Sequence, residues 1–277
     1  MATNSALLET IPGTLYDHPK YYDLVFGSDW KAEFDFLQAC FAKYADRTVR
    51  TLFEPACGTG RLMIKFAQAG YAVAGNDLCE KAIDYCNARL ARNGFATSAV
   101  VGNMADFHLR PGVDAAYNMI NSFRHLNRES QAFSHLQCVA DALAPGGIYV
   151  LGFHLTPTQG TALSEESWSA RRGPLAVLSH LSTIDVDLAQ RTEWVDMTFD
   201  VYTPTRSFQL SEKIPFRTYT ARQMLRLLKK VETLDIVATY DFAYDSDHPI
   251  HVGPETEDVV YVLKKDRNIR DRKMVTV

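Results

Sequence analysis

Between residues 48 and 155 the hydrophobic positions alternate between short apolar runs and stretches with helical spacing. The apolar runs predict five strands, at 49–53, 71–74, 98–101, 113–120 and 148–153. Helical patterns lie between them, at 61–68, 80–92 and 128–143, and turn residues such as Gly70, Asn93-Gly94 and Pro145-Gly146-Gly147 follow them. Strands alternating with helices predict right-handed crossovers and a parallel sheet covered on both faces, which is an α/β fold.

The pattern changes on either side of this region. Residues 1–47 carry aromatic residues at helical spacing, whereas 175–187, 191–202 and 207–217 alternate with a period of two, as in an antiparallel meander. A helix at 221–231, capped by Thr220, and strands at 234–242 and 259–263 complete the fold. We therefore expect an N-terminal helical segment (1–47), an α/β core (48–155 and 220–265), an antiparallel β insertion (156–219) and a charged tail (266–277).

A glycine-rich turn follows the first strand of the α/β core. The run Leu52-Phe53-Glu54-Pro55-Ala56-Cys57-Gly58-Thr59-Gly60-Arg61-Leu62 leads from an apolar strand into a helix. Such a turn marks a ligand site at the carboxyl edge of a parallel sheet, because glycines admit a ligand close to the backbone and the helix start offers free N–H groups. Asp77 ends the second strand, 17 residues after Gly60, where a carboxylate can accept both hydroxyls of an adenosine ribose.

Dinucleotide-binding enzymes share these two features, so other residues in the turn must indicate whether the ligand is a dinucleotide or a different nucleoside. Met63 stands where a pyrophosphate-binding turn has its third glycine. Glu54 is expected to point into the cleft, where a carboxylate repels a pyrophosphate and attracts a cationic amino group. The turn therefore favours S-adenosylmethionine, whose methionine moiety carries such a group.

The order of motifs across about residues 48–155 resembles that of class I S-adenosylmethionine-dependent methyltransferases. Glu54-x-Ala56-x-Gly58-x-Gly60 stands at the family's first motif, with Ala56 in place of the first glycine, and Asp77 stands at its ribose-binding acid. The segments 101–107, 117–126 and 144–147 complete the order, with Asn103 where the family usually has Asp. The resemblance implies a Rossmann-like seven-stranded mixed sheet with helices on both faces. It also implies a cofactor site lined by Tyr21, Glu54, Ala56, Gly58, Gly60, Asp77, Leu78, Asn103, Met104 and Met119.

Two shorter segments indicate the kind of methyl acceptor. Asn121-Ser122-Phe123-x-His125-Leu126 and the antiparallel insertion resemble small-molecule N-methyltransferases that act on glycine and on amino sugars. Tyr16-Asp17-x-x-x-Tyr21-Tyr22-Asp23 resembles the N-terminal lid of those enzymes, which makes residues 1–47 a helical lid and Tyr21 a lid residue. Methyl transfer needs alignment, exclusion of water and a partner for the departing proton. The candidate catalytic residues are His125, His154 and Asn121, although each histidine could instead be purely structural.

Charge and composition narrow the class of partner. The chain has 277 residues, 29 Lys and Arg against 33 Asp and Glu, and a formal net charge of −4, with no basic run typical of nucleic-acid binding. No apolar run approaches the roughly 20 residues that span a bilayer, and the N-terminus lacks a secretory pattern. Five cysteines without a Cys-x-x-Cys pair predict neither a disulfide framework nor a metal site and fit the cytoplasm. We expect a cytoplasmic enzyme for a small-molecule substrate, with no nucleic-acid or membrane partner; it could form a homodimer.

Three alternatives stay open at this point. The chain could be a nicotinamide-dependent oxidoreductase, which Met63 and Glu54 oppose. It could bind S-adenosylmethionine without catalysis, because binding and turnover use the same glycine turn. It could also methylate a protein, which would need an open mouth in place of a lid. The preferred interpretation is N-methylation of a small molecule by in-line displacement, over O-methylation.

Overall fold

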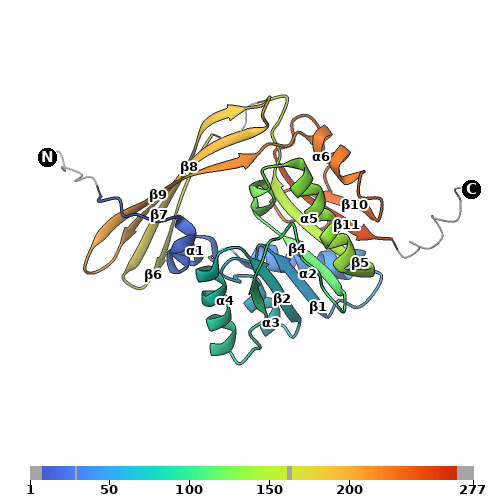
Figure 1. Cartoon of the computed structure of the whole chain (residues 1–277), viewed down its shortest axis with the longest axis horizontal. Helices are drawn as coiled ribbons and strands as arrows, with labels where there is room; N and C mark the ends of the chain where they lie inside the picture. The colour runs from blue at the N-terminus through green and yellow to red at the C-terminus, as the bar shows by residue number, and fades with distance from the viewer. Residues whose placement is uncertain (1–7, 29, 161–163, 267–277) are drawn as a thin grey trace, which may run out of the picture.

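The computed structural model describes residues 8–28, 30–160 and 164–266 and contains two sheets (Figure 1). The larger sheet is built from β1 (Thr51–Pro55), β2 (Ala72–Asp77), β3 (Ala99–Val101), β4 (Val113–Asn118), β5 (Leu143–His154), β10 (Leu234–Tyr240) and β11 (Asp258–Lys265). Its strand order is β3-β2-β1-β4-β5-β11-β10, and β11 runs antiparallel to both of its neighbours. The order reverses direction between β1 and β4, and a parallel sheet binds ligands beside such a switch point.

Helices cover both faces of this sheet because alternate residues of its strands point to opposite sides. Leu52 and Ala115 share one apolar cluster with α2 (Trp30–Tyr44) and α3 (Met63–Gln68), and α4 (Glu80–Arg92) packs against α3. Phe53 and Ala116 point the other way, into a cluster with α5 (Glu129–Ala142) and α6 (Ala221–Leu228). Every residue of β4 is buried, as expected for a central strand covered on both sides.

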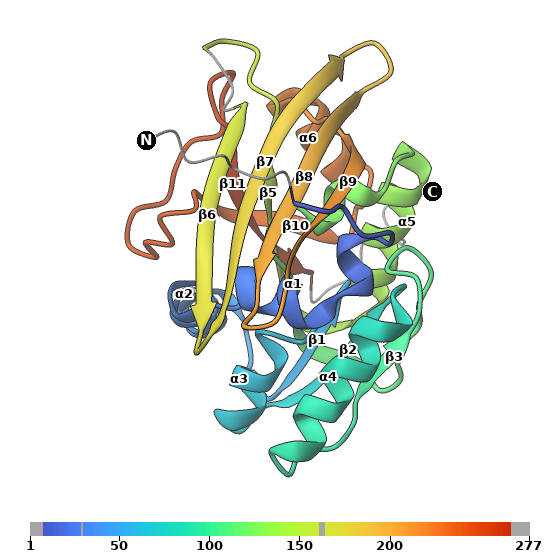
Figure 2. The same ribbon diagram turned by 90° about the vertical axis from the view of Figure 1, so that its left-hand side faces the viewer.

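The second sheet is antiparallel and has the strand order β6-β7-β8-β9. Its strands are β6 (Glu165–Arg172), β7 (Leu175–Asp187), β8 (Thr192–Tyr202) and β9 (Ser207–Arg217). The N-terminal elements η1 (Leu15–Asp17) and α1 (Pro19–Phe26) lie against one face of it, where Leu24 and Val25 pack on Val177 and Phe199. Figures 1 and 2 show α1 between this sheet and the larger one. The N-terminal segment and the insertion therefore form one cover over the carboxyl edge of the large sheet.

The α/β fold predicted from the sequence is confirmed, including the seven-stranded mixed sheet, the helices on both faces and the antiparallel insertion. The insertion contains one strand more than the pattern indicated. That strand is β6, which has the sequence Glu165-Glu166-Ser167-Trp168-Ser169-Ala170-Arg171-Arg172 and too few apolar residues to show an alternation. The predicted domain boundaries stay predictions, and the charged tail lies outside the described residues except for Asp266.

The fifth strand also begins earlier than predicted. Pro145-Gly146-Gly147 was expected to separate a helix from a strand starting at residue 148, but β5 runs from Leu143 through these residues. Val113 pairs with Leu143 and Ala115 pairs with Ile148, so the intervening residues form an irregularity in the ladder. Gly146 adopts φ 75° there, which a glycine tolerates without a steric penalty. The turn residues therefore mark a bulge within the strand.

Candidate active site

The glycine turn leaves β1 and passes directly beside the end of β2. Ala56, Gly58 and Gly60 adopt φ values of 55°, 52° and 67°. A Cβ on Gly60 would lie 2.3 Å from the Sγ of Cys86, so this glycine is required by packing against α4. A Cβ on Gly58 would meet only the Asp77 carboxylate, at 4.0 Å, so this position faces open space at the strand ends. Gly58 is therefore the glycine whose missing side chain leaves room for a ligand.

Asp77 lies at the end of β2 and faces this space. Its carboxylate accepts hydrogen bonds from the backbone N–H groups of Gly58 (2.9 Å) and Cys79 (2.8 Å). Burial raises the pKa of Asp77, although these two backbone donors favour the charged form. The next residue, Leu78, exposes 71% of its side chain, which is unusual for an apolar residue beside a buried turn. A carboxylate next to an uncovered apolar surface can hold the ribose and the adenine of one nucleoside.

Glu54 is buried at the end of β1, as a carboxylate that lines a deep site should be. It accepts a hydrogen bond from the Tyr117 hydroxyl (3.0 Å), and burial raises its pKa well above the usual range. The Arg61 guanidinium lowers that pKa, but Arg61 is itself held by Glu33 through two bonds of 2.8 and 2.6 Å. Burial therefore disfavours the charged form of Glu54, and a cationic group bound beside it would lower its pKa and favour the carboxylate.

The other predicted cofactor residues lie in two places. Ala56, Leu78, Asn103, Met104 and Met119 follow the carboxyl ends of β1, β2, β3 and β4, at the edge that also carries Gly58 and Asp77. The Asn103 side chain already accepts a hydrogen bond from the backbone N–H of Ala105 (2.8 Å). Tyr21 lies elsewhere, in α1 against the antiparallel sheet, where its ring packs on Phe208 at 5.7 Å. Its contacts are therefore those of a residue that fixes α1 to the cover.

Tyr16 belongs to the predicted lid motif but not to the predicted cofactor residues, and it lies near the strand ends. Its hydroxyl lies 3.0 Å from Nε2 of His125, in η2 (Ser122–His125), and its carbonyl accepts a bond from the Cys79 Sγ. Burial raises the pKa of Tyr16 well above its ordinary value, and the Asp77 carboxylate adds to that rise. Its place in the lid motif was the available signal, but a one-dimensional pattern cannot tell which of two nearby tyrosines turns toward the strand ends.

The two candidate catalytic histidines lie on different sides of the β4 end. His125 is half-buried, and its pKa is lowered to about 4 by desolvation and by the neighbouring Arg124, so it is neutral at pH 7. His154, at the end of β5, places Nδ1 2.7 Å from the Asp258 carboxylate. Asn121 positions this histidine, because its side-chain oxygen accepts the backbone N–H of His154 (2.8 Å).

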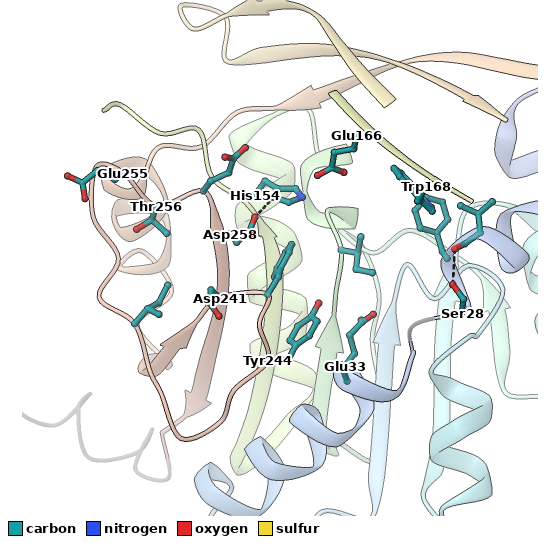
Figure 3. A pocket seen from close by; sticks show the side chains of 17 residues that line it. Ser28, Glu33, His154, Glu166, Trp168, Asp241, Tyr244, Glu255, Thr256 and Asp258 are labelled. Carbon is teal, nitrogen blue, oxygen red and sulfur yellow. Dashed lines mark hydrogen bonds and ion pairs between the residues drawn. The ribbon is translucent and has the colours of Figure 1, made fainter. Parts of the chain in front are cut away.

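A cavity of about 990 Å³ opens beside His154 (Figure 3). It extends from Ile120, at the end of β4, to β6 of the cover and to the loop between β10 and β11. Trp168, Phe242 and Tyr244 supply aromatic surface, and Figure 3 shows the His154 ring between Asp258 and Glu166. This volume is at the upper end of the range for small-molecule sites, about 300–1,000 Å³.

Backbone strain gathers around the same space. Ile120 and Tyr244 both line the cavity and both adopt φ 55°, and Asn121 adopts φ 64°. Positive φ is costly for a β-branched or bulky side chain, about 1–3 kcal/mol per residue, and persists where the surrounding structure enforces it. Such strain is concentrated at functional sites, so its location supports the assignment of this edge as the active site.

The cover is fastened to the glycine turn by a buried carboxylate in α1. Asp23 accepts hydrogen bonds from Thr59 of the turn (3.0 Å) and from Tyr85 of α4 (3.3 Å). It also forms an ion pair with Arg89, and Arg172 of β6 lies 3.8 Å away. One side chain therefore connects α1, the glycine turn, α4 and the antiparallel sheet.

Within 8–28, 30–160 and 164–266, no group of three or more His, Cys, Asp or Glu side chains is arranged to hold a metal ion. In the same part of the chain, no helix has the length and apolar character needed to cross a bilayer.

Sequence comparison gives a match to a family model over part of the chain. Residues 53–147, which include the glycine turn and Asp77, match the family described as "Methyltransferase domain". A Streptomyces venezuelae enzyme named dTDP-3-amino-3,4,6-trideoxy-alpha-D-glucopyranose N,N-dimethyltransferase is 28% identical over 138 residues, which is 49% of this chain and 56% of that protein. The chain thus aligns with little more than half the length of the curated relatives it matches.

Comparison of structures covers almost the whole chain. An S-adenosylmethionine-dependent methyltransferase from Clostridium acetobutylicum superposes with a TM-score of 0.72 at 16% identity, covering 90% of this chain and 98% of the other. DesVI from Streptomyces venezuelae gives 0.71 at 19% identity, with 88% and 97% covered. The sugar N-methyltransferase KedS8 from Streptoalloteichus gives 0.70 at 17% identity, with 96% and 99% covered. Residues 53–147 thus match a methyltransferase domain, and the chain as a whole shares the Rossmann-like fold of these solved methyltransferases.

Proposed function

We propose that this protein transfers a methyl group from S-adenosylmethionine to an amino group of a small molecule. The observation that carries the proposal is the juxtaposition of two spaces at one sheet edge. The open position at Gly58 and the Asp77 carboxylate lie at the ends of β1 and β2, and the 990 Å³ cavity begins at Ile120, at the end of the neighbouring β4. One space suits a nucleoside and the other an acceptor.

The residues around Gly58 fit S-adenosylmethionine. Gly58 leaves open space beside the Asp77 carboxylate, which can accept ribose hydroxyls, and Leu78 exposes an apolar surface for the adenine. Glu54 supplies negative charge below the turn for the methionine amino group. When bound, the cofactor supplies a methyl group made electrophilic by its positively charged sulfur. A carboxylate at this position would repel a pyrophosphate, so the negative charge of Glu54 also opposes the binding of a nicotinamide coenzyme.

His154 is the residue best placed to receive a proton from the acceptor amine. With Nδ1–H donating to Asp258, the lone pair of Nε2 is left for the cavity, and the carboxylate stabilises the ring when it becomes charged. The tautomer follows from the carboxylate partner. Asn121 and Asp258 are positioning residues in this scheme, because they act through the histidine. The cover formed by α1 and the antiparallel sheet excludes water from the reacting groups.

His125 has a different role in this proposal. It is neutral, half-buried and bonded to Tyr16, whose carbonyl contacts Cys79 beside Asp77. We infer that the Tyr16–His125 pair closes the lid over the nucleoside and does not take the proton of the acceptor. The variant Tyr16→Phe should then weaken the binding of S-adenosylhomocysteine. If the Tyr16–His125 pair instead took the acceptor's proton, the variant would lower kcat and leave that binding unchanged.

The acceptor class follows from the cavity and from the relatives. The Streptomyces venezuelae relative is named for an amino sugar and KedS8 is named as a sugar N-methyltransferase, so a small amino-bearing molecule of similar size is proposed here. A cytoplasmic location, a homodimer and the absence of nucleic-acid partners stay predictions from the sequence.

The test combines binding and turnover. Calorimetry should show binding of S-adenosylhomocysteine and none of a nicotinamide coenzyme. Radiolabelled S-adenosylmethionine should then transfer its methyl group to a component of a mixture of amines and amino sugars. Binding without any transfer across that mixture would favour a non-catalytic S-adenosylmethionine-binding protein, and labelling of proteins instead would contradict the small-molecule acceptor.

A further inference from the structure

The lining of the cavity beside His154 is rich in carboxylate side chains. Six carboxylate residues line it, Glu33, Glu166, Asp241, Glu255, Glu257 and Asp258, and no lysine or arginine is among its 17 lining residues within the described chain. Glu33 forms an ion pair with Arg61, and Asp258 accepts a hydrogen bond from the His154 ring. Glu166, Asp241 and Glu255 add further negative charge to the lining, and like charges gathered in a cavity favour a cationic ligand over an anionic one.

We propose that the methyl acceptor is a phosphate-free molecule that carries several amino groups, of the size of a small aminoglycoside, and not a nucleotide-linked sugar. This inference rests on the proposed methyltransferase function and specifies its substrate class. It departs from the substrate in the name of the Streptomyces venezuelae relative, which contains a nucleoside diphosphate.

Charge repulsion is the first argument. A nucleoside diphosphate brings two negative charges, and proteins hold such groups with Arg, Lys or the N–H groups of a helix start. Figure 3 shows Glu166 on one wall of the cavity and the Asp258–His154 pair facing it, so a diphosphate placed between them would meet carboxylates on both sides. Several ammonium groups would instead find a carboxylate on each wall.

The aromatic residues give the second argument. Phe242 and Tyr244 are stacked, with ring planes 23° apart, and the His154 ring meets the edge of Phe242 at 5.0 Å. Trp168 presents a further ring from β6. Aromatic faces attract ammonium groups and also pack against sugar rings. Apolar faces alternating with carboxylates match a molecule whose rings carry amino groups.

The third argument concerns the reaction. An amine in water near pH 7 is an ammonium ion, which has no lone pair for attack. Before transfer it must give up a proton, and His154 is placed to accept it. The carboxylates hold the remaining ammonium groups of the same molecule, so one nitrogen can become neutral at His154 while the others anchor the acceptor in the cavity.

Calorimetry of the full chain saturated with S-adenosylhomocysteine tests the inference. The cationic probe is neamine, and the anionic probe is dTDP-3-amino-3,4,6-trideoxyglucose. The variant Glu166→Gln removes one charge from the cavity wall. The matched control is Glu165→Gln, because Glu165 is the preceding residue of β6, is exposed and does not line the cavity.

Neamine is expected to bind at least about tenfold more tightly than the nucleotide sugar, with an affinity that falls as salt is added. Glu166→Gln should weaken neamine binding by about two- to fivefold, since a partly exposed ion pair is worth roughly that much, and Glu165→Gln should leave it unchanged. Absence of neamine binding, equal loss in both variants, or tighter binding of the nucleotide sugar would overturn the inference. In those cases, methyl transfer to the nucleotide sugar would leave the proposed function intact, whereas failure to bind S-adenosylhomocysteine would refute that function itself.

Discussion

Truncation of Asp77 separates the role of this carboxylate in the fold from its role in binding. In the structure it accepts two backbone N–H groups, from Gly58 at 2.9 Å and from Cys79 at 2.8 Å. In the proposed complex it also accepts ribose hydroxyls. Asp77→Ala removes both sets of bonds, so it should lower the free energy of unfolding and weaken the binding of S-adenosylhomocysteine.

The loss of stability and the loss of affinity can each be estimated from the hydrogen bonds removed. Hydrogen bonds to a charged group contribute about 1.5–3 kcal/mol, and Gly58 faces open space where water can replace the lost acceptor. We therefore expect a loss of about 2 kcal/mol in the free energy of unfolding, which lowers Tm by about 4–8 °C. Ribose hydroxyls without a partner inside the bound complex should cost about 1.5–3 kcal/mol, a decrease in affinity of roughly 10- to 150-fold.

Calorimetry with S-adenosylhomocysteine and thermal unfolding by circular dichroism measure the two effects separately. Asp77→Asn keeps the size of the side chain and one carbonyl acceptor, so it should recover part of the affinity. Asp84→Ala is the control, because it removes the same charge from an exposed position on α4. If Asp77→Ala binds S-adenosylhomocysteine with native affinity, the ribose assignment is wrong, whatever happens to Tm.

Three further predictions concern other parts of the molecule. His154→Asn should lower kcat by about 10²- to 10⁴-fold and leave the Kd for S-adenosylhomocysteine unchanged; a change in Kd alone would contradict its proton-accepting role. Glu33→Gln should lower the free energy of unfolding by about 3–5 kcal/mol in urea titrations, because it strands the buried Arg61, whereas Asp35→Asn should cost less than about 1 kcal/mol, since the Lys31–Asp35 pair on the same helix is exposed. Burial lowers the pKa of His135 from 6.5 to about 4, so the unfolded chain binds more protons between these values and stability falls as the pH drops through that window. At pH 5 this loss is about 2 kcal/mol, and His135→Gln should lose that much less between pH 7 and pH 5; an identical loss in variant and parent would refute the assignment.

The class of fold could be predicted because local patterns determine it. Fully buried parallel strands need unbroken apolar runs and antiparallel ones need alternation, and both signals are strong for β4 and β8. The prediction failed where tertiary context replaced the local pattern. The strand β6 has few apolar residues and is held in place by pairing with β7, and Pro145-Gly146-Gly147 became a bulge because the β4 ladder continues past it.

The candidate site likewise contains residues that local sequence patterns locate and contacts that only the fold creates. Gly58 and Asp77 could be named from spacing alone, because a strand end followed by a turn fixes where such residues lie in any parallel sheet. The roles assigned to Glu54, Ala56 and the other predicted cofactor residues stay predictions. The Tyr16–His125 contact joins residues 109 positions apart, and the Asp258 partner of His154 is 104 positions away. No local pattern contains contacts of that separation.

The sequence by itself determined the α/β order, the glycine turn and the acidic residue beside it, because these depend on neighbours within a few positions along the chain. Only the tertiary structure decided which side chains share the acceptor cavity. That cavity brings together α1, α2, β5, β6 and the loop before β11, segments whose meeting depends on how the antiparallel sheet folds back over the large sheet. The negative charge of the cavity exists only as the sum of carboxylates from these separate segments, and so the class of acceptor proposed here could not be inferred before the fold was known.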